Sequence, residues 1–242
     1  MINYNRTQDI WPVFPYQSLV RIPLVDGLKM QEMGESPQQL LDQGVRVDWN
    51  KTLDKRVYTG VGNYPGLVNN PGITSTALPA TGVGSSTHWS AKTPELIRED
   101  FDFMAMQIWN ASGNAPEALP NRFLVSPARY EALLQPMVLG GAGGFASVKE
   151  YLMKSSMLNS FGVEPEIYPL PVWLETVGTG AVPEIVAYKF DEDCMSIRLA
   201  VDIQRFGGPL SVVEGAYEVT YVGNIGIVKI NRPQTVQYFY GA

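Results

Sequence analysis

A helical pattern of apolar positions is clearest near the middle of the chain. Four apolar residues are spaced at i, i+4, i+7 and i+11 and share one helical face: Ile97, Phe101, Met104 and Ile108. The dipeptide Thr93-Pro94 precedes them and is typical of a helix start. We therefore predict a helix from about residue 94 with one face packed against a core.

Two capping boxes predict further helix starts. In Ser36-Pro37-Gln38-Gln39 a serine can cap the helix and a glutamine stands three residues later, and Ser147-Val148-Lys149-Glu150 repeats this pattern. Gly44 predicts the end of the first helix, so we expect a separate helical segment at 48–58. The second box predicts a helix that ends near Gly162.

Alternation of apolar and polar residues replaces the helical period after residue 163. A short buried strand is expected earlier, at 123–125, followed by a helix from Ser126-Pro127 to Leu134. The predicted later strands are 166–170, 185–190, 195–201, 214–222, 226–231 and 235–240. Helices in the middle and strands at the end indicate an α+β fold rather than a doubly wound one.

Residues 1–35 have no amphipathic period. Pro12, Pro15 and Pro23 interrupt any helix, so we predict an extended arm that lies across its own domain or across a neighbouring subunit, and we favour the neighbour. Residues 59–90 are rich in glycine, proline, asparagine, serine and threonine and predict a long ordered loop with short strands.

Composition narrows the possible functions. Of the 242 residues, 45% are hydrophobic, 11% aromatic and 17% charged. A surface with few charges and many aromatic residues is expected to be partly covered by another subunit. The net charge of −6, without a basic run, argues against sequence-specific nucleic-acid binding, although loose packaging of nucleic acid inside a container stays open.

Cysteine usage and hydropathy indicate the compartment. The single cysteine, Cys194, cannot form an internal disulfide and is interpreted as a partly buried thiol. No apolar run approaches the roughly 20 residues of a membrane span, and the first residues lack a hydrophobic signal core. We expect a soluble, unsecreted protein that folds in a reducing cytoplasm.

Residue types that carry chemistry are scarce. His88, the single histidine, has no nucleophile motif beside it and is interpreted as a surface or contact residue. Asp191-Glu192-Asp193 lacks the pattern of a calcium loop and predicts a solvated turn. The glycine run 140–144 lacks the Gly-Lys-Ser/Thr of a phosphate loop and predicts a flexible loop. We therefore predict no catalytic, cofactor-binding or metal-binding residues, and the five tryptophans are assigned to cores or subunit contacts.

Six groups of segments follow one another in a recognisable order of strands and helices: Leu67 to Gly72, Asn121 to Pro127 with Tyr130 to Leu134, Val163 to Pro171, Val186 to Val201, Tyr217 to Gly223, and Arg232-Pro233 with Val236 to Tyr238. Through these segments the chain resembles the Hong Kong 97-type capsid fold of tailed bacteriophages and encapsulins. The resemblance covers 36–242. In two respects the chain departs from the family: the region before the spine helix is short, and the spine helix expected at 48–58 is short as well.

The resemblance implies a domain plan. It assigns 1–35 to an N-terminal arm with a reduced extended loop, 36–72 to a peripheral (P) domain with the spine helix, 73–194 to an axial (A) domain, and 195–242 to strands that return to the P-domain. No lysine–asparagine crosslinking pair can be assigned.

The resemblance also implies a function. The chain is expected to be a major capsid protein, not an enzyme, that self-assembles as pentamers and hexamers into an icosahedral virion shell in the host bacterial cytoplasm. Candidate partners are decoration, scaffold and portal proteins and packaged double-stranded DNA bound without sequence specificity, with no membrane. The alternatives are an encapsulin-like nanocompartment shell, an enzyme with an unrecognised hydrolytic site, and a tail or decoration protein.

Overall fold

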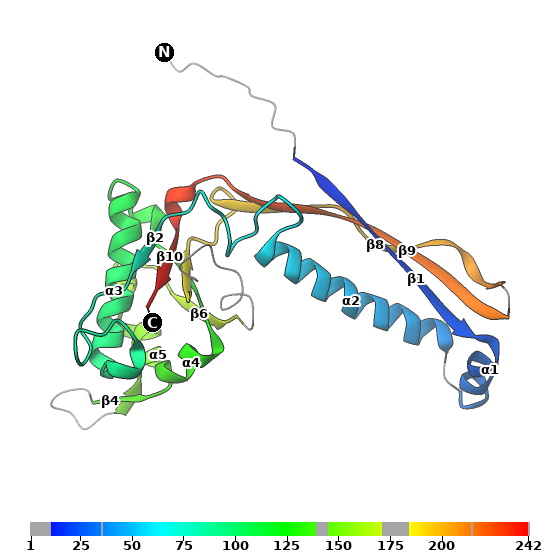
Figure 1. Ribbon diagram of the computed structural model, residues 1–242, viewed down its shortest axis with the longest axis horizontal. Helices are drawn as coiled ribbons and strands as arrows, with labels where there is room; N and C mark the ends of the chain where they lie inside the picture. The colour runs from blue at the N-terminus through cyan, green and yellow to red at the C-terminus, as the bar shows by residue number, and fades with distance from the viewer. Residues whose placement is uncertain (1–10, 35, 139–144, 171–183, 214, 242) are drawn as a thin grey trace, which may run out of the picture. The chain divides into compact units, whose positions relative to one another are not determined.

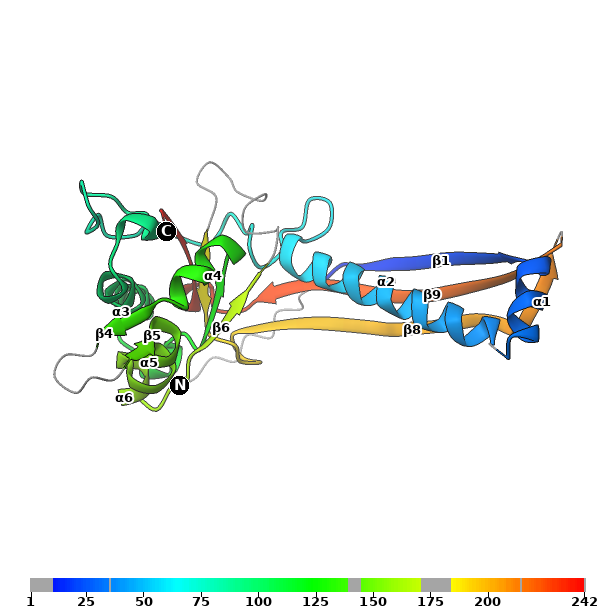
Figure 2. The same ribbon diagram turned by 90° about the horizontal axis from the view of Figure 1, so that it is seen from below.

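The structure is a computed structural model that describes residues 11–34, 36–138, 145–170, 184–213 and 215–241. Helices and strands are arranged as Figure 1 and Figure 2 show. The α-helices are α1 (Leu24–Glu32), α2 (Pro37–Thr59), α3 (Pro94–Ala111), α4 (Pro127–Leu133), α5 (Val148–Ser155) and α6 (Met157–Ser160). The strands are β1 (Val13–Pro23), β2 (Ser75–Ala77), β3 (Arg122–Val125), β4 (Pro136–Val138), β5 (Phe145–Ser147), β6 (Glu166–Pro169), β7 (Ile185–Tyr188), β8 (Met195–Val213), β9 (Ala216–Ile230) and β10 (Val236–Tyr240).

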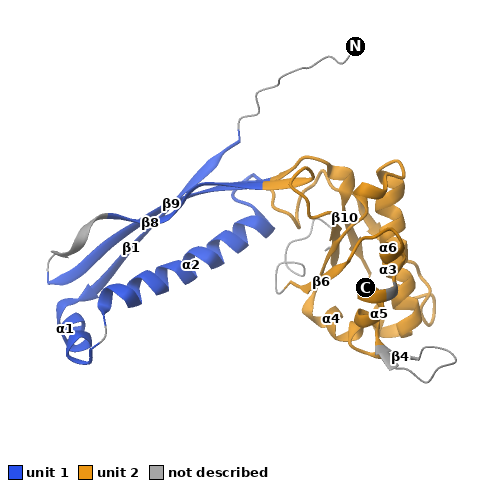
Figure 3. Ribbon diagram, turned by 180° about the vertical axis from the view of Figure 1, so that it is seen from behind, with its two compact units in different colours: residues 1–64, 197–228 blue, residues 65–196, 229–242 orange. Residues whose placement is uncertain are grey.

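The chain forms two compact units (Figure 3). The first unit comprises residues 1–64 and 197–228, and the second comprises 65–196 and 229–242. These limits differ from the predicted domain boundaries, because residues 65–72 and 229–242 belong to the second unit. The names A-domain and P-domain stay predictions.

The first unit is built on a three-stranded sheet in the order β1-β9-β8. Strand β1 pairs antiparallel with β9, from Val13 opposite Gly226 to Pro23 opposite Ala216. Residues 13–23 of the predicted arm are extended and belong to the sheet of their own chain, which is the less favoured of the two predicted placements. Residues 24–32 form helix α1, which corrects the prediction of an extended segment there. The prolines are compatible with this strand because β1 lies at the edge of the sheet. Residues 1–10 of the predicted arm lie outside the described residues.

Helix α2 is a single helix of 23 residues, and this corrects the prediction that Gly44 divides it. Its start is as predicted: Ser36 accepts a hydrogen bond from the Gln39 backbone N–H. Burying a side chain such as Val45 contributes about 1.5–3 kcal/mol, more than the roughly 1 kcal/mol that a mid-helix glycine costs. The buried face of α2, which continues beyond Gly44, therefore keeps the helix intact.

One face of α2 packs on the sheet of the first unit. Leu41, Val45 and Trp49, at i, i+4 and i+8, enter a core with residues from all three strands: Ile22, Ile203, Val219, Tyr221 and Ile225. The Trp49 ring lies over Gly223, where an added Cβ would be 2.5 Å from the ring. Two tyrosines on the strands also bind aspartates of α2: Tyr16 Oη donates to Asp48 at 2.5 Å, and Tyr221 Oη donates to Asp42.

The second unit is built on a five-stranded sheet in the order β2-β10-β7-β3-β6. Strand β7 pairs antiparallel with β3 and β10, whereas β3–β6 and β10–β2 are parallel pairs. The strands predicted at 123–125, 166–170 and 185–190 are present, at Arg122–Val125, Glu166–Pro169 and Ile185–Tyr188. Strand β9 is continuous, so the two strands predicted at 214–222 and 226–231 are one.

Helix α3 contributes five buried residues to the core of the second unit. Ile97, Phe101, Met104 and Ile108 are all buried, so the predicted helical face is confirmed. They pack with Phe123, Ile185 and Phe239 of the sheet. The helix predicted from 147 to 162 begins with the expected bond from the Glu150 N–H to Ser147 Oγ, at 3.1 Å. It is divided into α5 and α6 because Ser156 has an extended backbone.

Candidate assembly surfaces

Exposed large hydrophobic side chains are concentrated on the first unit. Among the described residues, the first unit carries eleven and the larger second unit six. Those of the first unit are Trp11, Val13, Leu19, Val25, Leu28, Met33, Leu40, Val47, Tyr64, Leu199 and Phe206. Such concentration on one part of a subunit is typical of a surface that another molecule covers.

The edge strand β1 shows how this exposure arises. Its residues alternate, so that Tyr16 and Ile22 face the core with α2 whereas Val13 and Leu19 are exposed. Leu19 lies opposite Thr220 in the antiparallel pair, so both project from the sheet face away from α2. Strand β1 therefore presents apolar side chains on an open face.

A hollow of about 280 Å³ lies between α2 and β8 in the first unit. Its polar lining is Asp42, Arg46, Gln204, Arg205 and Tyr221. Burial, together with the hydrogen bond to Asp42, raises the pKa of Tyr221 to about 12, so the phenol stays a donor at neutral pH. The guanidinium groups of Arg46 and Arg205 place positive charge in the lining beside the Asp42 carboxylate.

The second unit presents a smaller aromatic patch, formed by residues of β3 and β6 and by Phe190, which follows β7. The Arg122 guanidinium lies 4.2 Å from the ring centroid of Phe190 and 5.1 Å from that of Tyr168, and it pairs with Glu166 at 2.9 Å. The side-chain amide of Asn121 holds the Phe190 backbone through bonds at 2.6 and 3.2 Å. Arginine and aromatic side chains held in this way are common at the centres of protein interfaces.

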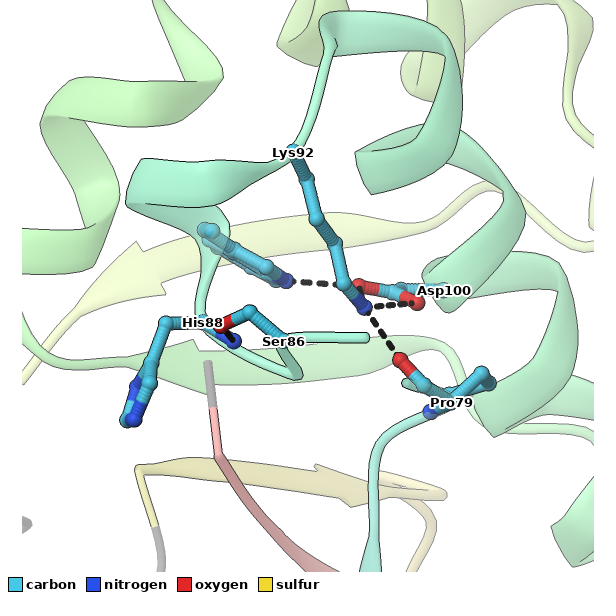
Figure 4. Close-up of polar contacts among 6 residues, drawn as sticks. Pro79, Ser86, His88, Lys92 and Asp100 are labelled. Carbon is cyan, nitrogen blue, oxygen red and sulfur yellow. Dashed lines mark hydrogen bonds and ion pairs between the residues drawn. The ribbon is translucent and has the colours of Figure 1, made fainter. Parts of the chain in front are cut away.

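A buried ion pair anchors the loop that precedes α3 (Figure 4). Lys92 Nζ donates to both Asp100 carboxylate oxygens at 2.7 and 2.8 Å and to the Pro79 carbonyl at 2.7 Å. Trp89 Nε1 also donates to Asp100, at 2.8 Å. Burial raises the pKa of Asp100, and the bonds from Lys92 and Trp89 oppose this shift. The pair fixes both ends of the loop 79–92 against α3.

Tyr238 fixes the turn that follows residue 66. Its hydroxyl donates to the Leu67 carbonyl at 2.6 Å and accepts from the Asn70 N–H at 3.0 Å. Burial raises the pKa of Tyr238, which keeps the hydroxyl protonated. This contact joins two of the segments that carry the family resemblance, 67–72 and 236–238.

The residues considered for chemistry do not come together. His88 is exposed, and its backbone N–H donates to Ser86 Oγ at 3.2 Å. Cys194 is buried, and its N–H donates to the Asp191 carbonyl at 3.1 Å. Asp191 also accepts from the Asp193 N–H at 2.9 Å, which confirms the predicted polar turn. The predicted glycine loop at 140–144 lies outside the described residues.

Sequence reasoning missed the Lys92–Asp100 pair, although a signal was present. Asp100 stands one residue before Phe101 and three after Ile97, so the predicted buried face of α3 included a carboxylate. A carboxylate on an apolar face requires a cation, because an unpaired buried charge is strongly destabilising. The tryptophans follow the prediction in part: Trp49 and Trp89 are buried in cores, and Trp109 packs on Phe161.

In the described ranges no group of three or more histidine, cysteine or acidic side chains is placed to hold a metal ion. Among the helices described, none is both long and apolar enough to cross a membrane.

Comparisons with known proteins agree on one kind of protein. The family described as "Major capsid protein" matches residues 1–241. No curated protein sequence matches the chain. Among solved structures, the chain is similar to the capsid of Myoviridae phage XM1, with a TM-score of 0.74 and 12% identity over 96% of this chain and 74% of that one.

Two further structures share the fold. The capsid of a native GTA particle has a TM-score of 0.63 at 10% identity, covering 96% of this chain and 73% of that one. A virus-like particle from Pyrococcus furiosus has a TM-score of 0.57 at 14% identity, covering 97% and 79%. At such identities the similarity shows the fold alone, and that fold is the one used by particle-forming proteins.

Proposed function

This chain belongs to the major capsid protein family and is a capsid shell subunit with the Hong Kong 97-type fold, and on that premise we propose that its copies form pentamers and hexamers that close an icosahedral phage shell. As a capsid subunit it is a component of the virion. Assembly in the cytoplasm of the host bacterium is part of the proposal.

The distribution of exposed hydrophobic side chains carries this proposal. A subunit that stayed alone would gain nothing from the eleven large apolar side chains that are exposed on the described part of its smaller unit. A shell subunit repeats its contacts by symmetry, so the same side chains are covered in every copy. The first unit is therefore assigned the larger share of the contacts between subunits.

The charge balance bears on how a shell of this subunit would hold its content. The chain carries 18 basic and 24 acidic residues. Tight binding to a phosphate backbone requires a basic surface, which this balance does not favour. We propose that the shell encloses double-stranded DNA without sequence-specific contacts, and that portal, scaffold and decoration proteins are candidate partners.

A non-enzymatic role agrees with the family and with the contacts of the titratable residues. The buried ion pair Lys92–Asp100 anchors a loop, and the acidic turn at 191–193 is bonded to its own backbone. We propose that these groups stabilise the subunit and catalyse nothing.

Cryo-electron microscopy of particles formed by the expressed chain tests the arrangement of copies. We expect fivefold and sixfold clusters of one subunit type in a closed shell. Open sheets, or a shell without fivefold vertices, would contradict the proposed pentamers and hexamers. The content of particles isolated from infected or induced cells tests the cargo: DNA supports a phage capsid, whereas an enclosed enzyme would favour an encapsulin-like compartment.

A further inference from the structure

Gly44 lies near the middle of the α2 helix, and no contact within its own chain requires a glycine at this position. The helix runs from Pro37 to Thr59, and Gly44 is exposed. An added Cβ would find no atom within 4 Å, and the backbone φ of Gly44 is not positive. An alanine would therefore fit and would favour the helix more than glycine does. The subunit alone gives no explanation for the missing side chain.

Large apolar side chains flank Gly44 on the same side of α2. Leu40, four residues before it, is 50% exposed, and Val47, three residues after it, is 53% exposed. Positions i−4, i and i+3 are neighbours on a helix surface, so the three residues form one continuous stripe. Lys51, a further four residues on, extends the stripe. We call these four residues the α2 stripe.

The α2 stripe combines a close-approach position with uncovered apolar contacts. A helix position without a side chain lets a second backbone or a bulky side chain approach closely. Leu40 and Val47 would contact such a partner on either side of the glycine. Within the described residues Lys51 has no acid at ion-pair distance, so it is available to an acidic group of the partner.

We propose that the α2 stripe is a docking site for a second copy of this chain, with Gly44 at the point of closest approach. The inference rests on the proposed function, because a shell is built by copies of one subunit. Charge favours the second unit of the neighbouring copy as the contacting part. It contains 14 acidic and 9 basic residues, whereas the segment 46–56 of α2 contains four basic and two acidic residues. Lys51 would then meet an acidic surface.

Adding a side chain at residue 44 tests the docking site. In Gly44→Leu the new side chain extends into open space in the isolated subunit, so its melting temperature should be no lower than that of the parent chain. Assembly should require at least about tenfold more protein, measured as the particle fraction by sedimentation over a concentration series. Gly44→Ala should show a smaller effect in the same direction.

Gln39→Leu is the matched control. Gln39 is also exposed on α2, but at 100° per residue it lies about 140° around the helix from Gly44, and it is not three or four residues from any member of the α2 stripe. This variant should assemble like the parent chain. If Gly44→Leu also assembles like the parent, the docking site is refuted while the proposed function stands. If the parent chain itself forms no particles, the proposed function fails instead.

A photo-crosslinking side chain at Val47 gives a second readout. In assembled particles it should form a product of two chains, with the crosslinked peptide in residues 65–196 or 229–242 of the other copy. Particles that give only crosslinks within one chain would overturn the proposal, as would a partner peptide confined to the first unit.

Discussion

The two units of the subunit bury their hydrophobic residues in different ways. In the second unit, a five-stranded sheet and helix α3 enclose an extensive core that includes Phe101, Phe123 and Phe239. In the first unit, one helix covers one face of a three-stranded sheet, and Leu19 is exposed on the other face. The second unit therefore buries most of its large apolar side chains in its own core. The first unit leaves more of its large apolar side chains exposed, where other subunits can cover them.

The two units also differ in their polar contacts. The second unit contains a buried ion pair with three side-chain donors and acceptors, Lys92, Asp100 and Trp89. In the first unit, hydrogen bonds from Tyr16 and Tyr221 fasten α2 to the sheet. The comparison indicates that substitutions in the second unit should act on folding, whereas substitutions on the surface of the first unit should act on assembly.

The largest expected effect on stability is that of Asp100→Asn. Because it leaves Lys92 buried without its counter-charge, we expect a loss of about 3–5 kcal/mol in the free energy of unfolding. Urea titration measures the loss, and hydrogen exchange should locate it in the second unit. Glu95→Gln, on the exposed side of the same helix, should change stability by less than about 0.5 kcal/mol. Equal effects of the two variants would refute the anchoring role of the ion pair.

A substitution under Trp49 is expected to have the next largest effect. Gly223→Val places a branched side chain where even a Cβ would be 2.5 Å from the indole, and such overpacking costs about 1–3 kcal/mol. Hydrogen exchange should rise in α2 and β9 while the second unit keeps its protection. Thr220→Val, on the same strand but facing away from α2, should leave exchange nearly unchanged.

Removal of the Tyr238 hydroxyl should cost less. Tyr238→Phe leaves the Leu67 carbonyl and the Asn70 N–H without their partner, at a cost of about 1 kcal/mol. A fall in the denaturation midpoint with faster exchange at residues 67–70 is the expected result. Unchanged exchange at this turn would show that the hydroxyl does not hold it.

The smallest expected effect on the isolated subunit is that of Val47→Gln. Because the side chain is already exposed, the free energy of unfolding should change by at most about 0.5 kcal/mol. Assembly should nevertheless weaken, since the covered contact would be lost. If Val47→Gln lowered the stability of the subunit but assembled normally, the assignment of assembly contacts to the surface of the first unit would be wrong.

Local sequence patterns predicted much of the second unit. The spacing of Ile97, Phe101, Met104 and Ile108 identified α3, and the capping box at Ser147 marked the start of α5. These signals are reliable because each depends on residues within one or two turns. The scarcity of histidine and cysteine and the lack of catalytic motifs likewise indicated a chain without a catalytic centre. That expectation stays a prediction.

The first unit was harder to predict because distant residues determine its elements. Helix α1 begins after Pro23 without a capping bond and contains Gly27, which packs on the Tyr217 ring from β9. Gly44 resembles a helix end, but the buried positions of Val45 and Trp49 continue α2 past it. The exposed surfaces could not be located before the fold was known, since exposure depends on how β1, β9 and α2 pack.

The most direct test of the central claim is the mass of the purified chain in solution. Sedimentation velocity combined with negative-stain electron microscopy should show closed particles of megadalton mass built from the 26.7 kDa subunit. A stable monomer at high protein concentration, with no particles on the grid, would contradict the account of this chain as a self-assembling shell subunit.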